Sequence, residues 1–167
     1  MKILSIIPAR GGSKGIRLKN LVRLDGKPLL HYTIMASLES KLVDRTIVST
    51  DNKKIAEQAK KLGAEVITRP KQLATDESLL EPVIQHALDF LKVKKQYRPD
   101  IIVLLQNTSP LRSSAYVDGA LSLLIKKKYD SVLSGYPWQV FSWKVKNDSS
   151  IIPYSYDTQN RSRRQES

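Results

Sequence analysis

The chain has no cysteine among its 167 residues, so disulfide bonds and thiolate metal sites are excluded. It also lacks any apolar run approaching the ~18 residues that a membrane-spanning helix needs. Its first apolar stretch, residues 3–7, is too short for the hydrophobic part of a secretion signal, and no small-residue cleavage site follows it. These absences predict a soluble, cytoplasmic protein with no membrane partner. With 41% apolar residues, the chain can still bury a sizeable core.

Acidic residues are scarce relative to basic ones. There are 28 Lys and Arg residues against 16 Asp and Glu residues, which gives a formal net charge of +12. Such a surplus suggests an anionic partner, for example a nucleic acid, a phosphorylated small molecule or a membrane surface. Many of the lysines fall within or at the ends of predicted helices, where a solvated surface is the simplest explanation. The basic loop at 10–19 and the tail residues Arg161, Arg163 and Arg164 are harder to explain in this way.

Short β-branched apolar runs alternate with helical patterns along the chain. The runs lie at residues 2–7, 46–50, 64–68, 101–106 and 130–135. Their continuous apolar character predicts strands that are buried on both faces, as in a parallel sheet. The helical patterns begin after Pro28, after Asp51, near Leu80 and near Ser114. The alternation predicts an α/β fold with a doubly wound, mostly parallel sheet.

The last part of the chain, residues 136–167, differs from the rest and is called the late arm below. It holds both tryptophans and lacks helical periodicity. It could form a β-excursion with a turn near Asn147 and Asp148. Its aromatic residues could mark a partner surface or could cover the open sheet, and the sequence favours neither. We therefore expect an α/β core in residues 1–135 and a separate arm in residues 136–167.

The loop after the first strand, residues 8–15, is the first candidate site, since ligands of doubly wound sheets bind beyond the carboxyl ends of the strands. Its glycines let backbone N–H groups approach an anion. Arg10, Ser13 and Lys14, followed by Lys19, supply side-chain donors for phosphate oxygens. The loop is neither a P-loop nor a GxGxxG fingerprint. It suggests a nucleotide triphosphate loop of another design, with a merely flexible basic turn as the alternative.

The second and third strands also end in polar residues. Asp51 follows the second strand, and we favour a helix N-cap over a ligand there. Arg69 follows the third strand, at the same sheet edge as Arg10, where it suits a second phosphate or a base. Thr75 and Asp76 lie in the next loop, and a helix cap and a functional role are equally open for them.

The fourth predicted strand runs into the sequence QNTSPLR at residues 106–112. Adjacent polar and turn residues at the tip of a buried strand are typical of a binding site. Neutral amides and hydroxyls suit sugar hydroxyls and an acyl amide better than they suit phosphate. This segment is therefore a candidate sugar contact.

Four segments together resemble the acylneuraminate cytidylyltransferases, also called CMP-sialic acid synthetases: IIPARGGSKGIRLKN, VSTD, RP…LATDES and LLQNTSPLR. The ARGGSKG element followed by LKN is the most specific. CMP-Kdo synthetases look less similar, since they carry an aspartate where this chain has Asn107 and Thr108. The resemblance implies a Rossmann-like, glycosyltransferase-A-like nucleotidyltransferase. Its partners would be CTP and a nine-carbon, acidic 2-keto sugar, and its products a CMP-sugar and pyrophosphate.

The resemblance also implies roles for individual residues. Those expected to bind the nucleotide are Arg10, Gly11, Gly12, Ser13, Lys14, Asn20, Arg69 and Ser78. Those expected on the sugar side are Gln106, Thr108, Ser109 and Lys144. Those expected to take part in catalysis are Arg10, Lys19, Arg163 and Arg164. The two tail arginines could serve the site of a neighbouring subunit, because the late arm is expected to form a homodimer.

The resemblance implies departures as well. Relatives usually carry a small side chain shortly after the position of Ser78, where this chain has Leu79 and Leu80. They are also expected to continue past Ser167 to a pair of aspartates that hold Mg²⁺. We therefore expect a truncated chain that has no metal ligands of its own, uses Mg²⁺ with CTP, and turns over slowly or not at all.

Other functions stay open. A nucleic-acid-binding module would use the +12 charge, but aromatic residues are only 7% and are not interleaved with the basic ones as a stacking platform requires, so no nucleic-acid partner is expected. A catalytically inactive assembly or regulatory subunit would keep the fold and pair through the late arm. A nucleotidyltransferase for hexose 1-phosphates would usually carry more glycine in the first loop. Sialic, legionaminic and pseudaminic acids are not distinguished.

Overall fold

The computed structural model of the chain describes residues 1–13, 15–135 and 142–154. The chain divides into two units, Met1–Val132 and Leu133–Ser167. Every helix among the described residues is too short or too polar to cross a membrane.

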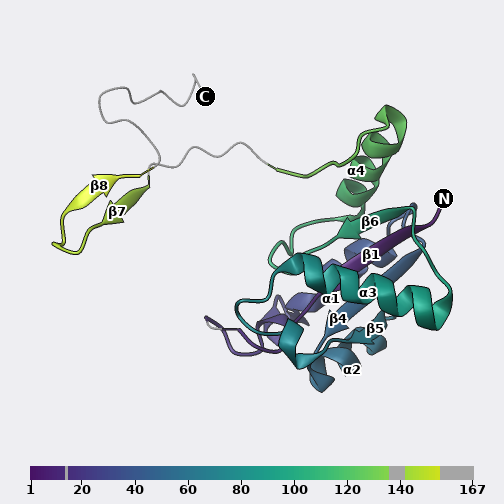
Figure 1. Cartoon of the computed structure of the whole chain (residues 1–167), viewed down its shortest axis with the longest axis horizontal. Coiled ribbons are helices and arrows are strands. Elements are labelled where there is room, and N and C mark those ends of the chain that lie inside the picture. The colour runs from purple at the N-terminus through teal and green to yellow at the C-terminus, as the bar shows by residue number, and fades with distance from the viewer. Residues whose placement is uncertain (14, 136–141, 155–167) are drawn as a thin grey trace. The chain divides into compact units, whose positions relative to one another are not determined.

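The first unit is built on a four-stranded parallel sheet with the order β5-β4-β1-β6 (Figure 1). Its strands are β1 (Ile3–Pro8), β4 (Arg45–Thr50), β5 (Glu65–Thr68) and β6 (Ile101–Leu104). In the central register Ile6 of β1 pairs with Ile47 of β4 on one side and with Leu104 of β6 on the other. The parallel α/β fold predicted from the alternating pattern is confirmed.

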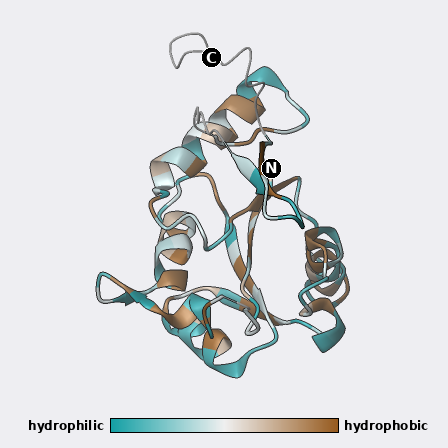
Figure 2. Cartoon of the chain, turned by 90° about the vertical axis from the view of Figure 1, so that its left-hand side faces the viewer, coloured by the Kyte–Doolittle hydropathy of each residue, from teal (hydrophilic) through white to brown (hydrophobic). Residues whose placement is uncertain are grey.

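Helices cover both faces of this sheet. They are α1 (Leu29–Leu38), α2 (Lys53–Lys61), α3 (Leu80–Lys95) and α4 (Ser114–Lys127). One buried cluster joins Ile3 and Ile7 of β1 to α1, α2 and α4, and a second joins Leu4 and Ile6 to α3. This division follows from the period of two along a strand, which points successive side chains to opposite faces. Figure 2 shows the hydrophobic strands between the helices.

Short elements complete the first unit. They are the 3₁₀ turns η1 (Lys19–Leu21) and η2 (Lys71–Leu73) and the two-residue strands β2 (Arg23–Leu24) and β3 (Lys27–Pro28). Strands β2 and β3 pair in an antiparallel hairpin. Its turn residues Asp25 and Gly26 have φ values of 47° and 76°, as a tight hairpin with an Asp-Gly turn requires.

The helix ends agree only in part with the sequence prediction. Helix α1 begins directly after Pro28, and Gly63, with a φ of 93°, follows the end of α2, both as predicted. The prediction that Asp51 caps α2 is wrong, because the Oδ1 atom of Asn52 accepts the N–H groups of Lys54 and Ile55.

Helix α3 begins after neither Thr75 nor Asp76, the two residues that were candidates for its cap. Its N-cap residue is Leu79, and no side chain caps the helix. Thr75 and Asp76 lie upstream of that position, in the loop between η2 and α3. The helix-cap alternative for these two residues is therefore wrong, and their side chains are engaged elsewhere.

The predicted strand at residues 130–135 is wrong, because these residues form no strand. Only Val132 and Leu133 are apolar in this stretch, and Leu133 is 87% exposed, so burial supplies no drive for pairing. Strand β6 consequently lies at an edge of the described sheet, with Ile102 and Leu104 each more than a third exposed. Burial on both faces, predicted for every strand, holds for β1 and β4 only.

Residues 143–153 of the second unit form a β-hairpin. Strand β7 (Trp143–Val145) pairs antiparallel with β8 (Ile151–Pro153). In the connecting loop the N–H of Lys146 donates to the carbonyl of Ser150, and the Asp148 carboxylate accepts both the N–H and the hydroxyl of Ser150. The predicted β-excursion with a turn at Asn147 and Asp148 is confirmed, whereas its role in dimerisation stays a prediction.

Candidate functional site

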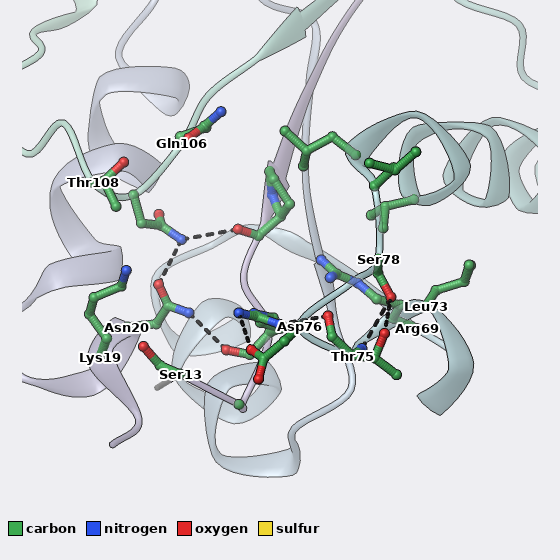
Figure 3. A pocket seen from close by; sticks show the side chains of 17 residues that line it. Ser13, Lys19, Asn20, Arg69, Leu73, Thr75, Asp76, Ser78, Gln106 and Thr108 are labelled. Carbon is green, nitrogen blue, oxygen red and sulfur yellow. Dashed lines mark hydrogen bonds and ion pairs between the residues drawn. The ribbon is translucent and has the colours of Figure 1, made fainter. Parts of the chain in front are cut away.

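A cavity of about 290 Å³ opens at the carboxyl ends of β1, β5 and β6 (Figure 3). Nine of the predicted site residues line it: Arg10, Gly12, Ser13, Lys19, Asn20, Arg69, Ser78, Gln106 and Thr108. They come from three loops that lie far apart in the sequence. The cavity thus lies where ligands of parallel α/β sheets bind.

The remaining predicted residues lie elsewhere. Gly11 lines a neighbouring cavity on the α2 side of the first loop, and Ser109 follows the cavity residue Thr108 without lining the cavity. Lys144 lies in β7 of the second unit. Lys14, Arg163 and Arg164 are outside the described residues.

The first loop is held against the end of β4. The N–H of Ala9 donates to the carbonyl of Ser49 at 3.0 Å, and the N–H of Gly11 donates to the Asp51 carboxylate at 2.8 Å. A Cβ atom at Gly11 would lie 2.8 Å from the Asn52 amide nitrogen, so only glycine fits there without movement. Asp51, predicted as a helix cap, instead anchors the candidate phosphate loop.

Two buried amides join the first loop to the loop after β6. Asn20 and Asn107 are 7% and 5% exposed. The Asn107 amide donates to the Oδ1 atom of Asn20 at 3.0 Å and to the Pro8 carbonyl at 3.4 Å, and the Asn20 amide donates to the Arg10 carbonyl at 3.0 Å. Sequence reasoning singled out the neighbours of Asn107 and gave this residue no role of its own. Only its place within a polar run at a strand tip signalled it.

The guanidinium of Arg10, predicted to bind phosphate, has partners within the protein. Its Nη1 atom donates to the carbonyl of Thr75 at 2.6 Å, and its Nη2 atom lies 2.7 Å from the Asp76 carboxylate. Both side chains of this ion pair remain about one third exposed or more. In this structure the Asp76 carboxylate therefore binds the guanidinium of Arg10, which was predicted from the sequence to bind a phosphate.

The loop that carries Asp76 has its own hydrogen bonds. The Ser78 hydroxyl lies 2.8 Å from the Thr75 hydroxyl, accepts the N–H of Thr75 at 3.1 Å, and donates to the Gln72 carbonyl at 3.2 Å. All of these bonds are solvent-exposed. Ser78 thus shapes the turn next to Arg10 as well as lining the cavity.

Arg69 is buried beneath the cavity, with 5% of its surface exposed. Its Nη2 atom donates to the carbonyl of Ser49 at 2.7 Å, and its Nε atom donates to the Ser49 hydroxyl at 3.2 Å. Burial lowers the pKa of Arg69, and the nearby Asp51 charge acts in the opposite direction. Arg69 thus ties the ends of β4 and β5 together, in addition to lining the cavity.

The loop after β6 forms the opposite side of the cavity. Figure 3 shows Gln106 and Thr108 across the cavity from Thr75 and Ser78. The guanidinium of Arg112 donates to the Gln106 carbonyl at 3.4 Å, and burial lowers the pKa of Arg112. Hydrophobic side chains add an apolar strip to the cavity wall, among them Leu79, Leu80 and Val83.

Carboxylates are few around the cavity. Among the residues that the structure describes, no three His, Asp or Glu side chains gather as metal ligands would. Asp76 faces Arg10, and Asp51 faces the Gly11 N–H. The described residues thus do not fit a metal ion held by protein ligands alone, and Mg²⁺ stays a prediction.

Comparison with known proteins gives consistent matches. The profile of the family described as cytidylyltransferase matches residues 4–164. An N-acylneuraminate cytidylyltransferase of Escherichia coli O18:K1:H7 is 42% identical over 134 residues, which cover 80% of this chain and 31% of that protein. A CMP-N,N'-diacetyllegionaminic acid synthase of Legionella pneumophila is 41% identical, over 74% of this chain and 53% of that protein. The chain thus spans about a third to a half of these relatives.

Solved structures share the fold. A CMP:2-keto-3-deoxy-manno-octonic acid synthetase, solved with CTP, superposes with a TM-score of 0.63 at 22% identity, over 77% of this chain and 49% of that one. A cytidylyltransferase of Leptospira borgpetersenii superposes with a TM-score of 0.59 at 27% identity, over 77% of this chain and 50% of that one. The Rossmann-like nucleotidyltransferase fold predicted from the sequence is confirmed.

Proposed function

The chain belongs to the cytidylyltransferase family, and from this premise we propose that its cavity binds CTP. In the whole protein, the cytidylyl group would pass to a nine-carbon 2-keto acid sugar with release of pyrophosphate. The observation that carries the proposal is the gathering of the basic first loop, Ser78 and residues 106–108 around one cavity. Curated relatives named for sialic and legionaminic acids support this sugar class.

The phosphate side of the site is the first loop. Arg10, Ser13 and Lys19 line the cavity next to Gly12, where an added Cβ atom would meet no other atom within 4 Å. In the proposed reaction, the anomeric hydroxyl of the sugar attacks the α-phosphorus of CTP and the bond to the pyrophosphate oxygen breaks. Charge neutralisation and in-line positioning are the main catalytic demands of such a transfer. Arg10 would meet them by exchanging Asp76 and the Thr75 carbonyl for phosphate oxygens.

The base and the sugar would lie on the other walls. The apolar strip of Leu79, Leu80 and Val83 suits the face of a planar base, and Ser78 offers a hydroxyl beside it. Gln106 and Thr108 offer neutral donors and acceptors for the sugar. Arg69 would act mainly through its bonds to Ser49, because its guanidinium is buried there.

Other predicted features remain part of the proposal. Mg²⁺ would neutralise the phosphates of CTP, and among the described residues no cluster of three acidic or histidine side chains would hold it without the nucleotide. A homodimer would use the β7–β8 hairpin, whose Trp143, Val145 and Ile151 are each more than half exposed. Ser109, Lys144, Lys14, Arg163 and Arg164 keep the roles predicted for them.

The proposal is tested first by binding. Calorimetric titration should give CTP a higher affinity than UTP, ATP and GTP, and Arg10→Ala should weaken CTP binding at least about 30-fold. Arg17→Ala is the matched control, because Arg17 is an exposed cation of the same loop that does not line this cavity. Equal loss in both variants would mean that only general positive charge matters. Absence of CTP binding by both this chain and a version as long as its relatives would refute the proposal.

Turnover is tested separately. Release of pyrophosphate from CTP should be measured with sialic, legionaminic and pseudaminic acids and with a Kdo control, on this chain and on the longer version. Release with one nine-carbon acid would identify the acceptor. CTP binding without release from either version would favour an inactive, nucleotide-binding subunit instead.

A further inference from the structure

The side chain of Asn107 links two loops that are far apart in the sequence. Its amide nitrogen donates to Asn20 Oδ1, 87 residues away, and to the Pro8 carbonyl, 99 residues away. Asn107 lines the cavity together with its sequence neighbours Gln106 and Thr108, although only 5% of its surface is exposed. The segment that supplies Gln106 and Thr108 to the cavity is thus bonded, through the Asn107 amide, to the base of the first loop.

The direction of this hydrogen-bond chain is fixed by its ends. The carbonyls of Pro8 and Arg10 can only accept, so Asn107 and Asn20 must each turn an N–H group toward them. Asn20 then has its Oδ1 atom left to accept from Asn107. The chain therefore runs from Asn107 through Asn20 to the backbone of Arg10, without an alternative orientation of either amide.

One atom of this arrangement has no stabilising explanation. The Oδ1 atom of Asn107 is buried and accepts no hydrogen bond from the described residues. A buried unpaired acceptor lowers stability, so a small or apolar side chain would suit the packing better. An asparagine at this position is explained if its N–H group has a function that outweighs this loss.

We propose that Asn107 is a positioning residue, which acts through Asn20 to hold the backbone of Arg10 and thereby the phosphate-binding loop. The proposal rests on the function proposed above, in which that loop binds the phosphates of CTP. Asn107 need not touch the nucleotide. It also keeps Gln106 and Thr108 in register with Arg10, so that the sugar side and the phosphate side of the cavity are set together.

The decisive variant is Asn107→Asp, which keeps the shape of the side chain and removes the donor. At neutral pH the new carboxylate would face two acceptor oxygens, and the link to Asn20 would break. CTP affinity, measured by calorimetry well below the melting temperature, should fall about tenfold. Ser37→Ala is the control, because it removes a buried hydrogen bond to Thr46 outside the cavity and should lower stability without changing CTP affinity.

A double-mutant cycle separates positioning from general destabilisation. If Asn107 acts through Asn20, most of the tenfold loss should disappear when Asn107→Asp is made in an Asn20→Ala background. A loss of equal size in both backgrounds would overturn the proposal, and so would unchanged affinity of the single Asn107→Asp variant.

A measurement without nucleotide distinguishes this inference from the proposed function. Hydrogen exchange of Asn107→Asp should accelerate in residues 9–21 and stay unchanged in α2. If the unmodified chain fails to bind CTP while exchange accelerates in this way, the proposed ligand is wrong and the link from Asn107 to the loop stands. Unchanged exchange in residues 9–21 would overturn the inference whatever the ligand.

Discussion

The two sides of the cavity hold their polar side chains in opposite ways. On one side Asn20 and Asn107 are buried and bonded to each other and to backbone carbonyls. On the other side Asp76, Thr75 and Ser78 form exposed bonds to Arg10 and among themselves. Buried bonds are hard to replace because water cannot take over the lost partner, whereas exposed bonds exchange readily. The buried side is therefore preset, and the exposed side can release Arg10 to a ligand.

Among the variants that test this difference between the two sides, Asn20→Ala should have the largest effect on stability. It removes the acceptor of one Asn107 N–H group and the donor to the part-buried Arg10 carbonyl, at about 1–3 kcal/mol for each. Ser78→Ala removes as many or more hydrogen bonds on the exposed side and should lower the free energy of unfolding by less than about 1 kcal/mol, since water replaces them. Urea unfolding of both variants makes the comparison. Equal losses would show that burial does not distinguish the two sides.

Gly11→Ala tests whether the first loop is held in place at Gly11 as firmly as it is at Asn20. The new Cβ atom would lie 2.8 Å from the amide of Asn52, and the overpacking should lower the free energy of unfolding by about 1–3 kcal/mol. Gly12→Ala is the matched control, because a Cβ atom there meets nothing within 4 Å. Thermal unfolding of the two variants measures the difference. A stable Gly11→Ala protein with unchanged CTP affinity would mean that the loop shifts freely on β4.

The sheet and most helices could be predicted because their information is local. The apolar runs at 2–7 and 46–50 and the proline and glycine at helix ends each act within a few residues. The failed strand at 130–135 shows the limit of such runs, since two apolar residues do not form a strand without a partner. The β2–β3 hairpin was missed although Asp25 and Gly26 are a strong local turn signal.

The types of residue in the candidate site could be predicted from the sequence, whereas the hydrogen-bond partners of these residues could not. Glycine and basic residues after a first strand point to an anion, and the cavity gathers them. Which acceptor each donor reaches depends on loops brought together by the sheet. Asp51 and Asn52 illustrate this: both suit a helix cap, and only the approach of Gly11 decides that Asp51 holds the loop. The roles of Asp76 and Asn107 were hidden for the same reason.

Asp76→Asn tests whether the exposed side of the cavity can release Arg10 to a ligand. The change weakens the contact that competes with phosphate for Arg10, so CTP affinity should rise about two- to fivefold while stability changes by less than about 1 kcal/mol. Calorimetric titration at two salt concentrations provides the measurement, and Arg10→Ala should abolish the gain. A loss of affinity comparable to that of Arg10→Ala would show that Asp76 contacts the ligand itself.

The smallest effect on CTP affinity is expected at an ion pair remote from the cavity. This pair tests whether CTP affinity depends on charge anywhere on the sheet or only on charge at the site. Arg45 and Glu65 pair across β4 and β5, and the hydrogen bond from Arg45 lowers the pKa of Glu65 below its ordinary value of 4.5. A lowered pKa means that the pair stabilises the fold above the unfolded-state pKa, and that this contribution is lost as the pH falls through the folded-state pKa. Glu65 is half exposed, so the contribution should stay below about 1 kcal/mol.

Unfolding measured from pH 7 to pH 3 should therefore show a slightly smaller loss of stability in acid for Glu65→Gln than for the unmodified chain, with CTP affinity at pH 7 unchanged. A change of affinity as large as that of Asp76→Asn would mean that any ion pair at the sheet affects the site, and that the exposed side of the cavity is not special.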